Sequence, residues 1–221
     1  MKKIGIVGGI GPASTLDYYS GIINGFRQKT NDDNYPEIVI NSINMTEMLS
    51  YVSCQDWDAL VDLLLKSIKN LAKAGVELAS IASNTPHIVP LISIVEETCK
   101  YAQLKKCKKV VVIGTQFTMS SGLYAKAFKK YAITAVVPSE CEQTAIHNII
   151  FPKLEEGIVL PEDRQKIEIT ERLLVEQSAD GLVLGCTELP LIIKDKDLDT
   201  LILNTTQIHI EAIVNSIWQA L

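Results

Sequence analysis

Three features that would mark a membrane protein, a nucleic-acid-binding protein or a secreted protein are missing from this sequence. None of its apolar runs approaches the roughly 20 residues that a membrane span needs. Its 21 basic and 26 acidic residues give a net charge of −5, which offers no broad positive surface to phosphate backbones or anionic lipids. The apolar stretch after Met1 is soon broken by Gly8 and Gly9, which does not fit a signal peptide. We therefore expect a soluble protein with neither nucleic acid nor a membrane as a partner.

Cysteine is also scarce. The five cysteines are odd in number and lack the spacing of a metal site; they are Cys54, Cys99, Cys107, Cys141 and Cys186. We expect neither a disulfide framework nor a bound metal. Free thiols of this kind are typical of a reducing compartment, so the expected location is the cytoplasm.

Aromatic residues make up only 6% of the chain, while aliphatic residues are abundant, which favours parallel strands flanked by helices over a β-sandwich. Short β-branched runs recur, each followed by a turn and an amphipathic helical stretch, which is the pattern of βαβ units. The clearest helix runs over 56–74 and stops at Gly75. The sequence predicts an α/β fold with mainly parallel sheets, whose strands are 3–7, 38–42, 78–82, 109–113, 133–137, 181–184 and 201–203.

One pattern occurs twice in the chain. In LASIASNTPHIVPLI and in LVLGCTELPLII, an apolar strand leads into small and polar residues, a proline and an aliphatic continuation. The ends of two such strands could meet at a shared cleft, where α/β proteins bind small ligands. We expect two similar domains, with the active site in the cleft between them and a crossover near 98–108; a final helix near 207–220 should pack on the first half. The predicted domains are 1–98 with 206–221, and 99–205.

The first candidate site is the glycine turn from Gly8 to Ser14, which follows a strand and opens a helix with Pro12 at its first position. Backbone N–H groups in such a turn can bind an anion. A dinucleotide site would need a third glycine where Ser14 stands and an acidic residue at the end of the second strand, which instead ends Asn41-Ser42. A turn that binds no ligand is the alternative.

The second candidate is Cys186, which follows Gly185 where a strand is expected to give way to a helix. A positive helix end would favour the thiolate, although many free cysteines are buried and inert. Thr187 and Glu188 come next, and three polar residues after an apolar strand are costly unless they line a cleft. Cys186 is thus a candidate catalytic residue, and Thr187 and Glu188 are candidate substrate-binding residues.

The third candidate is the run Ser83-Asn84-Thr85, whose side chains can donate to and accept from a small polar ligand. Capping of a helix is the alternative for these residue types. His87 lies close by, but a lone histidine is more often a hydrogen-bonded part of the scaffold than a proton shuttle.

Taken together, four motifs resemble those of the aspartate/glutamate racemase family. The resemblance covers nearly the whole chain, and the order and spacing of the motifs make it specific. It implies two pseudo-symmetric three-layer α/β domains, an isomerase without a cofactor, and a homodimer. The motifs are Gly8-Gly9-Ile10-Gly11-Pro12, Ser83-Asn84-Thr85-Pro86-His87, Gly114-Thr115 with Thr118 and Met119, and Gly185-Cys186-Thr187-Glu188.

In that family two cysteines lie on opposite faces of the substrate α-carbon; one removes the proton and the other returns one. Cys186 matches the second cysteine, which serves the L-enantiomer, whereas Ser83 replaces the first. The resemblance assigns substrate binding to the backbone around Gly9 and to Asn84, Thr85, Thr115 and Thr187. Basic residues that hold the side-chain carboxylate in some members are absent from 44–51.

The resemblance therefore predicts a racemase of aspartate, glutamate or a close relative, with a small acidic amino acid as its ligand. A serine hydroxyl is a much weaker acid than a thiol, so Ser83 should be a poor partner for Cys186. Two alternatives stay open: a decarboxylase or isomerase of the same superfamily that uses Cys186 alone, and a binding protein for small acids without turnover.

Overall fold

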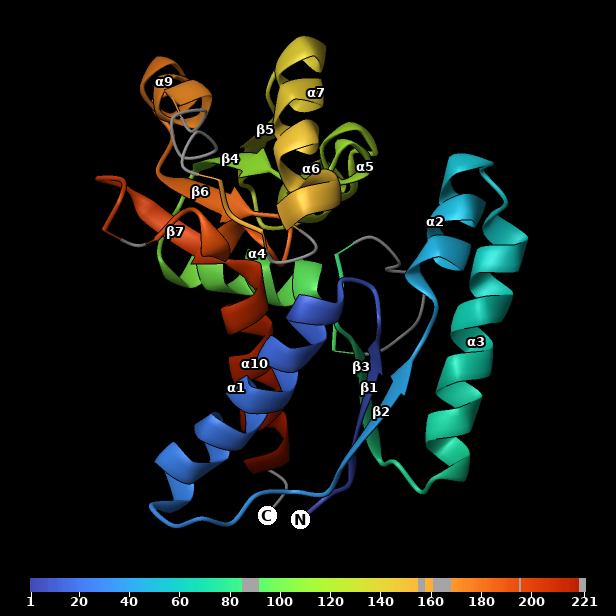
Figure 1. Ribbon diagram of the computed structural model, residues 1–221. Helices are drawn as coiled ribbons and strands as arrows, with labels where there is room; N and C mark the ends of the chain where they lie inside the picture. The colour runs from blue at the N-terminus through green and yellow to red at the C-terminus, as the bar shows by residue number, and fades with distance from the viewer. Residues whose placement is uncertain (85–91, 155–157, 161–167, 195, 219–221) are drawn as a thin grey trace. The chain divides into compact units, whose positions relative to one another are not determined.

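The computed structural model describes residues 1–84, 92–154, 158–160, 168–194 and 196–218. The chain divides into two compact units, one formed by Met1–Ser93 with His209–Leu221 and the other by Ile94–Ile208. Within each unit, a parallel sheet lies between helices (Figure 1). We refer to them as unit 1 and unit 2.

Unit 1 is built on a three-stranded sheet of order β2-β1-β3, with β1 (Ile4–Gly8) between β2 (Ile38–Ser42) and β3 (Leu78–Ile81). Both pairings are parallel, and Ile4 faces Ile38 on one side and Leu78 on the other. The helices of this unit are α1 (Pro12–Thr30), α2 (Met45–Ser53), α3 (Trp57–Lys73) and most of α10 (Thr205–Trp218).

Alternate residues of β1 face two separate apolar cores. Ile4 and Ile6 pack with α1 and α10, while Val7 packs with α2 and α3. This alternation follows from the two-residue period of a strand, and it places helices on both faces of the sheet (Figure 1). Unit 1 is therefore a three-layer α/β domain.

Unit 2 has a four-stranded parallel sheet of order β5-β4-β6-β7. Val110 and Val112 of β4 pack with α4 and α6 on one face, and Val111 and Ile113 pack with the helices of the opposite face. The strands are β4 (Lys109–Ile113), β5 (Thr134–Val136), β6 (Gly181–Leu184) and β7 (Leu201–Asn204). The helical elements are α4 (Ile94–Leu104), α5 (Gln116–Ser120), α6 (Leu123–Lys129), α7 (Glu140–Ile149), the π-type turn η1 (Ile150–Leu154), α9 (Glu168–Glu176) and the 3₁₀ turn η2 (Leu189–Leu191).

The α/β class and the parallel sheets predicted from the sequence are confirmed. Each strand lies within one residue of its expected range at either end. Asp56 caps α3 by accepting a hydrogen bond from the N–H of Ala59, and Gly75 follows its end with a φ of +77°. The order β2-β1-β3 recurs as β5-β4-β6, so the two units share a topology to which unit 2 adds β7.

The chain crosses between the two units twice. The first crossing lies between Ser93 and Ile94, before α4, and the second lies between Ile208 and His209, inside α10. The cause is apolar packing: Ile94 and Cys99 of α4 belong to the core that contains Val110 of β4. Polar and Cys residues near the end of α4 therefore mark the end of a helix of unit 2 and not the crossing.

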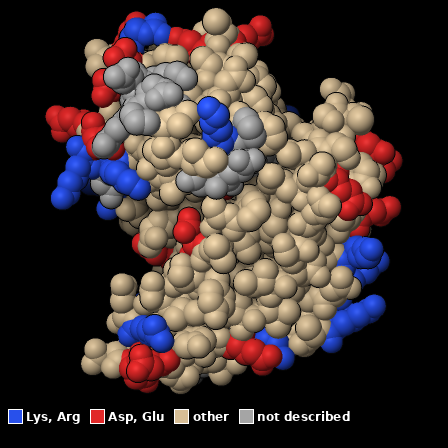
Figure 2. Space-filling view, in the orientation of Figure 1, with Lys and Arg blue, Asp and Glu red and all other residues tan. Residues whose placement is uncertain are grey.

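Charged side chains lie in small groups of mixed sign on the face drawn in Figure 2. The ion pairs of the protein include Lys3 with Glu37 in unit 1 and Arg172 with Glu142 in unit 2. Among the helices that the structure describes, none is both long and apolar enough to cross a membrane.

Asp180 joins the starts of two neighbouring strands of unit 2, and it gives a first prediction. Its carboxylate accepts hydrogen bonds from the N–H groups of Lys108 and Lys109, at 2.5 and 2.8 Å, and the bond from Lys108 is the main reason that its pKa is lowered. A lowered pKa stabilises the fold fully above the unfolded value of about 3.9 and progressively less as the pH falls through the folded value. Asp180→Asn should therefore lower Tm by about 1–3 °C at pH 7 and by less at pH 3.

Thermal melts of the native protein and the variant at the two pH values measure this difference. Asp62→Asn, a change at an exposed carboxylate on α3, is the control and should leave Tm unchanged at both. An equal loss at pH 7 and pH 3 in Asp180→Asn would show that the charge of Asp180 contributes nothing.

Candidate active site

In unit 1, the carboxyl ends of the three parallel strands bring two of the predicted motifs to one edge of the sheet. Gly9 follows β1, while Ser83 and Asn84 come shortly after β3. Ser83 and Asn84 are 6% and 4% exposed, and such burial of polar side chains is costly unless they are hydrogen-bonded. Thr85 and His87 of the same motif lie outside the described residues.

The glycine turn after β1 is fixed by its own helix. Gly9 has a φ of +80°, and a Cβ at this position would lie 2.3 Å from the carbonyl oxygen of Ile43. Its N–H donates to Thr15 Oγ1 at 2.9 Å. The N–H group of Gly9 thus serves the turn, so any contact of Gly9 with a substrate must come from another backbone atom.

Ser14, in the first turn of α1, ties this helix to the backbone just before Ser83. Its hydroxyl is fully buried and donates to the carbonyl oxygens of Gly11, at 2.9 Å, and Ala82, at 3.4 Å. The glycine turn and the end of β3 are therefore held together at one edge of unit 1.

In unit 2, β4 and β6 end in glycines whose backbones approach closely. A Cβ on Gly114 would lie 2.9 Å from the carbonyl oxygen of Gly185, and one on Gly185 would lie 2.9 Å from that of Ile113. Each glycine is followed at once by a predicted site residue. Thr115 caps α5, accepting from the N–H of Thr118 at 3.3 Å and lying 3.0 Å from its hydroxyl.

Cys186, Thr187 and Glu188 form a compact polar cluster at the end of β6. The Cys186 thiol donates to Glu188 Oε2 at 3.0 Å, and the Thr187 hydroxyl donates to the same oxygen at 2.8 Å. All three side chains are buried, and that of Glu188 is only 3% exposed. The carboxylate is thus positioned to take the proton of the thiol.

The helix expected after Cys186 is only the 3₁₀ turn η2, and this corrects the predicted source of thiol activation. A turn of three residues aligns too few peptide dipoles to present a strong positive end. The group that contacts the thiol is the carboxylate of Glu188. A proton acceptor, and not a helix dipole, is therefore the feature that the structure offers to Cys186.

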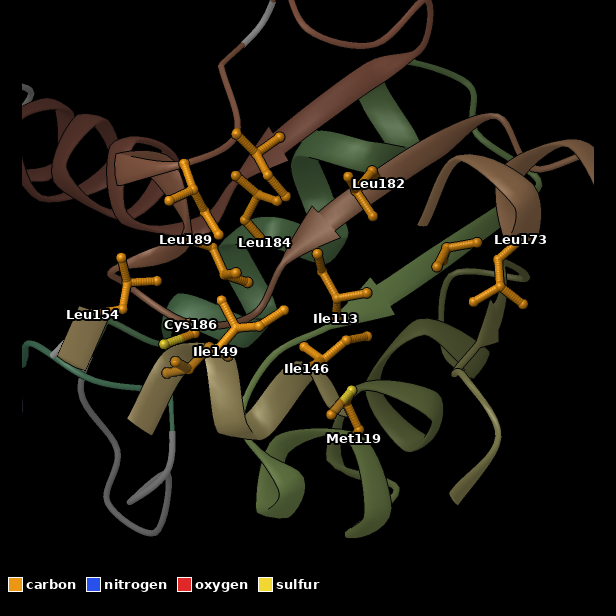
Figure 3. Close-up of a cluster of buried hydrophobic side chains, with 14 of the residues drawn as sticks. Ile113, Met119, Ile146, Ile149, Leu154, Leu173, Leu182, Leu184, Cys186 and Leu189 are labelled. Atoms are coloured by element: carbon orange, nitrogen blue, oxygen red, sulfur yellow. The ribbon is translucent and has the colours of Figure 1, made fainter. Parts of the chain in front are cut away.

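The apolar neighbours of Cys186 belong to the core of unit 2 that Figure 3 shows. The Cys186 side chain lies in the same apolar cluster as Ile149, Leu154 and Leu189. Its polar contact is with Glu188, which also accepts a hydrogen bond from Thr187. Cys99, in the other core of unit 2, is a contrasting case, because burial and the nearby charge of Glu96 raise its pKa to about 12. Cys99 thus lies in an apolar core, whereas the thiol of Cys186 donates a hydrogen bond to a carboxylate.

The neighbouring strand β7 ends in polar residues that the sequence analysis missed. Thr205 donates to the carbonyl oxygen of Leu184, two residues before Cys186, at 2.7 Å. The hydroxyl of Thr206 is buried and has no hydrogen-bond partner among the described residues. The run Asn204-Thr205-Thr206 follows an apolar strand, as Cys186-Thr187-Glu188 does, and this shared pattern was the available signal.

A hollow of about 390 Å³ lies elsewhere in unit 2, between α5 and α7 at the end of β5. Glu140 is its one ionisable side chain; its lining is Gln116, Met119, Ser120, Val137, Glu140, Gln143 and Thr144. None of these is a predicted site residue. Among the residues that the structure describes, no group of three or more His, Cys, Asp or Glu side chains could hold a metal ion.

Comparisons with known proteins agree with the motifs. The family described as Asp/Glu/hydantoin racemase matches residues 7–213. The broad specificity amino-acid racemase RacX of Bacillus subtilis (strain 168) is 29% identical over 86% of this chain and 87% of its own. An aspartate racemase homologue from Pyrococcus horikoshii OT3 is 33% identical, with a TM-score of 0.84 over 98% of this chain and 99% of that one. A Yersinia pestis structure assigned to the Asp/Glu racemases is 26% identical, with a TM-score of 0.89 over 99% of this chain and 100% of that one.

Replacement of Gly9 by alanine should destabilise the fold. Alanine at this position would need both a left-handed conformation and the space that the Ile43 carbonyl fills, so Gly9→Ala should cost more than about 2 kcal/mol in the free energy of unfolding. Gly122 also has a positive φ, but a Cβ there meets no atom within 4 Å, so Gly122→Ala should cost only about 1 kcal/mol of backbone strain.

Urea unfolding of the two variants compares these costs directly. If both substitutions cost the same, the contact with Ile43 is not a constraint on the turn.

Proposed function

The chain belongs to the Asp/Glu/hydantoin racemase family, and on this premise we propose that it racemises aspartate, glutamate or a close relative without a cofactor. The observation that carries the proposal is the buried hydrogen bond between Cys186 and Glu188. It supplies a thiol and a proton acceptor at the carboxyl end of a central strand, which is where α/β folds hold small ligands.

The proposed reaction begins when Glu188 takes the thiol proton, which leaves a thiolate at Cys186. The thiolate then removes the α-hydrogen of the L-enantiomer: the C–H bond breaks, an S–H bond forms, and the electron pair stays on the α-carbon. Oriented N–H and hydroxyl donors stabilise the resulting anion. Asn84, Thr85, Thr115 and Thr187 are the proposed donors to the carboxylate and amino groups of the substrate, with backbone around Gly9 in the same site.

Inversion requires a proton from the opposite face, and we assign that face to Ser83. The proposal requires that Cys186 and Ser83 act on the same substrate molecule. A hydroxyl donates its proton less readily than a thiol, so Ser83, or a water that it holds, should be the slower partner. Return of the proton from Cys186 to the original face should therefore be faster than inversion.

Helix α2 bears on which substrate side chain the site accepts. Helix α2 begins after Asn44, carries Glu47 and contains neither Lys nor Arg, so it offers no cation to a side-chain carboxylate. The named relative RacX is of broad specificity, and this supports a substrate range that extends beyond aspartate and glutamate. We further propose a cytoplasmic homodimer, as the family resemblance and the free thiols suggest.

The replacement of a family cysteine by Ser83 favours a second candidate. An enzyme that uses Cys186 alone could decarboxylate or isomerise a small acid without a second thiol. Release of CO₂, or formation of a product other than the opposite enantiomer, would identify that activity.

The third prediction concerns the two faces of the site. With L-aspartate in D₂O, uptake of deuterium at the α-carbon should exceed inversion several-fold, because Cys186 returns protons to the face from which it took them. Ser83→Cys should raise inversion relative to deuterium uptake by about 10-fold or more, since a thiol replaces a hydroxyl as acid. Mass spectrometry follows the uptake, and chiral chromatography of the same samples follows inversion.

Cys186→Ala is the matched control and should abolish both rates, while a cooperative thermal melt shows that the variant still folds. Full turnover in this variant would contradict the assignment of Cys186. Equal rates of uptake and inversion in the native protein would show that Ser83 is already a competent acid.

The fourth prediction separates Glu188 from a structural carboxylate. Glu188→Gln keeps the size of the side chain but cannot take the thiol proton, so deuterium uptake should fall by about 10²-fold at pH 7. In this variant the rate of deuterium uptake should rise as the pH approaches the pKa of a free thiol, near 8.5, because Cys186 must then lose its proton to solvent.

Glu171→Gln, a change at an exposed residue of α9, is the control and should leave the pH–rate profile unchanged. If Glu188→Gln keeps the native rate and profile, Glu188 does not serve the thiol.

A further inference from the structure

Tyr18, His209 and the backbone of Ile92 form a buried hydrogen-bonded chain inside unit 1. The Tyr18 hydroxyl lies 2.6 Å from His209 Nδ1, and His209 Nε2 lies 2.7 Å from the carbonyl oxygen of Ile92. Both side chains are fully buried, and their rings meet edge to face at 5.5 Å. The chain connects α1, α10 and the segment that leads out of β3.

The direction of each hydrogen bond follows from the carbonyl group. A carbonyl oxygen can only accept, so His209 carries its proton on Nε2 and donates it to Ile92. In the neutral ring Nδ1 is then the acceptor, and the Tyr18 hydroxyl donates to it. Tyr18 thereby fixes both the tautomer and the ring orientation of His209.

Apolar side chains also pack α10 against α1. Ile22 and Phe26 of α1 share a buried cluster with Ile213 and Ile217 of α10. A polar pair in this cluster adds a desolvation cost that two apolar side chains would avoid. Its specific effect is to hold one backbone oxygen, that of Ile92.

Two residues of α1 are linked to backbone oxygens near the end of β3 and before α4. Ser14 and Tyr18 lie one turn apart on the same face of α1. Ser14 contacts the carbonyl oxygen of Ala82, directly before Ser83, while Tyr18 reaches Ile92 through His209. Helix α1 thus contacts the backbone directly before Ser83, and through His209 it is linked to the backbone of Ile92.

We propose that Tyr18 and His209 are positioning residues for the Ser83–Asn84 face of the site. The inference rests on the proposed function, in which Ser83 returns the proton that inverts the substrate. Loss of the chain should displace Ser83 and Asn84 relative to the α-carbon and leave Cys186 of unit 2 unaffected. Displacements of about 1 Å can lower a rate by 10²-fold.

The test compares Tyr18→Phe, His209→Asn and His209→Gln with Ser67→Ala. Tyr18→Phe removes one hydroxyl and keeps the ring. His209→Asn loses the contact with Ile92, whereas the longer Gln amide can still donate to it. Ser67→Ala, the control, removes a buried hydroxyl that bonds within α3 of the same unit.

Two measurements are made on each variant at saturating L-aspartate in D₂O. Inversion should fall about 10-fold relative to α-deuterium uptake in Tyr18→Phe and His209→Asn, less in His209→Gln, and not at all in Ser67→Ala. Amide hydrogen exchange is measured without a ligand on the peptide that contains Ser83 and Asn84. It should become about 10-fold faster in Tyr18→Phe and His209→Asn, less so in His209→Gln, and should not change in Ser67→Ala.

A purely structural pair would lower both rates by the same factor and leave the amide exchange of this peptide equal to that of Ser67→Ala, and this result overturns the proposal. Absence of both turnover and uptake in the native protein would reject the proposed function. The amide exchange would then decide the positioning role by itself.

Discussion

A carboxylate can be buried only where donors replace the water it loses, and this constraint organises the end of β6. Glu188 is almost fully buried and accepts hydrogen bonds from Cys186 and Thr187. The close approach of β4 and β6 at Gly114 and Gly185 brings this cluster to the edge of the sheet. The bond from Cys186 to Oε2 offsets part of the cost of burying Glu188 and places a carboxylate beside the thiol.

Unit 1 also buries polar side chains at the end of a strand, but these side chains are neutral. Its polar strand end, at Ser83 and Asn84, follows an apolar sheet, and Ser14 of α1 contacts the carbonyl oxygen directly before it. The shared topology of the two units explains why both present polar residues at carboxyl strand ends. Their chemistry differs because unit 2 supplies a thiol and a carboxylate, whereas unit 1 supplies a hydroxyl and an amide.

Local patterns were sufficient to predict the strands, the cap of α3 and the α/β class, because each depends on residues close in sequence. The same kind of pattern made Cys186 and Ser83 candidates, since each follows an apolar strand. The bond from Cys186 to Glu188 depends on rotamers after the strand, and the contact of His209 with Ile92 spans 117 positions. The assignment of α4 to unit 2 depends on the packing of its apolar residues against β4, which are not adjacent to them in sequence.

The central claim is that Cys186 and Ser83 flank one carbon atom. A crystal structure with 2-methylaspartate, which has no α-hydrogen to lose, tests this most directly. The account predicts that the α-carbon lies within about 4 Å of both Cys186 Sγ and Ser83 Oγ, on opposite faces. A ligand that contacts Cys186 while Ser83 lies beyond the reach of the same molecule would contradict it.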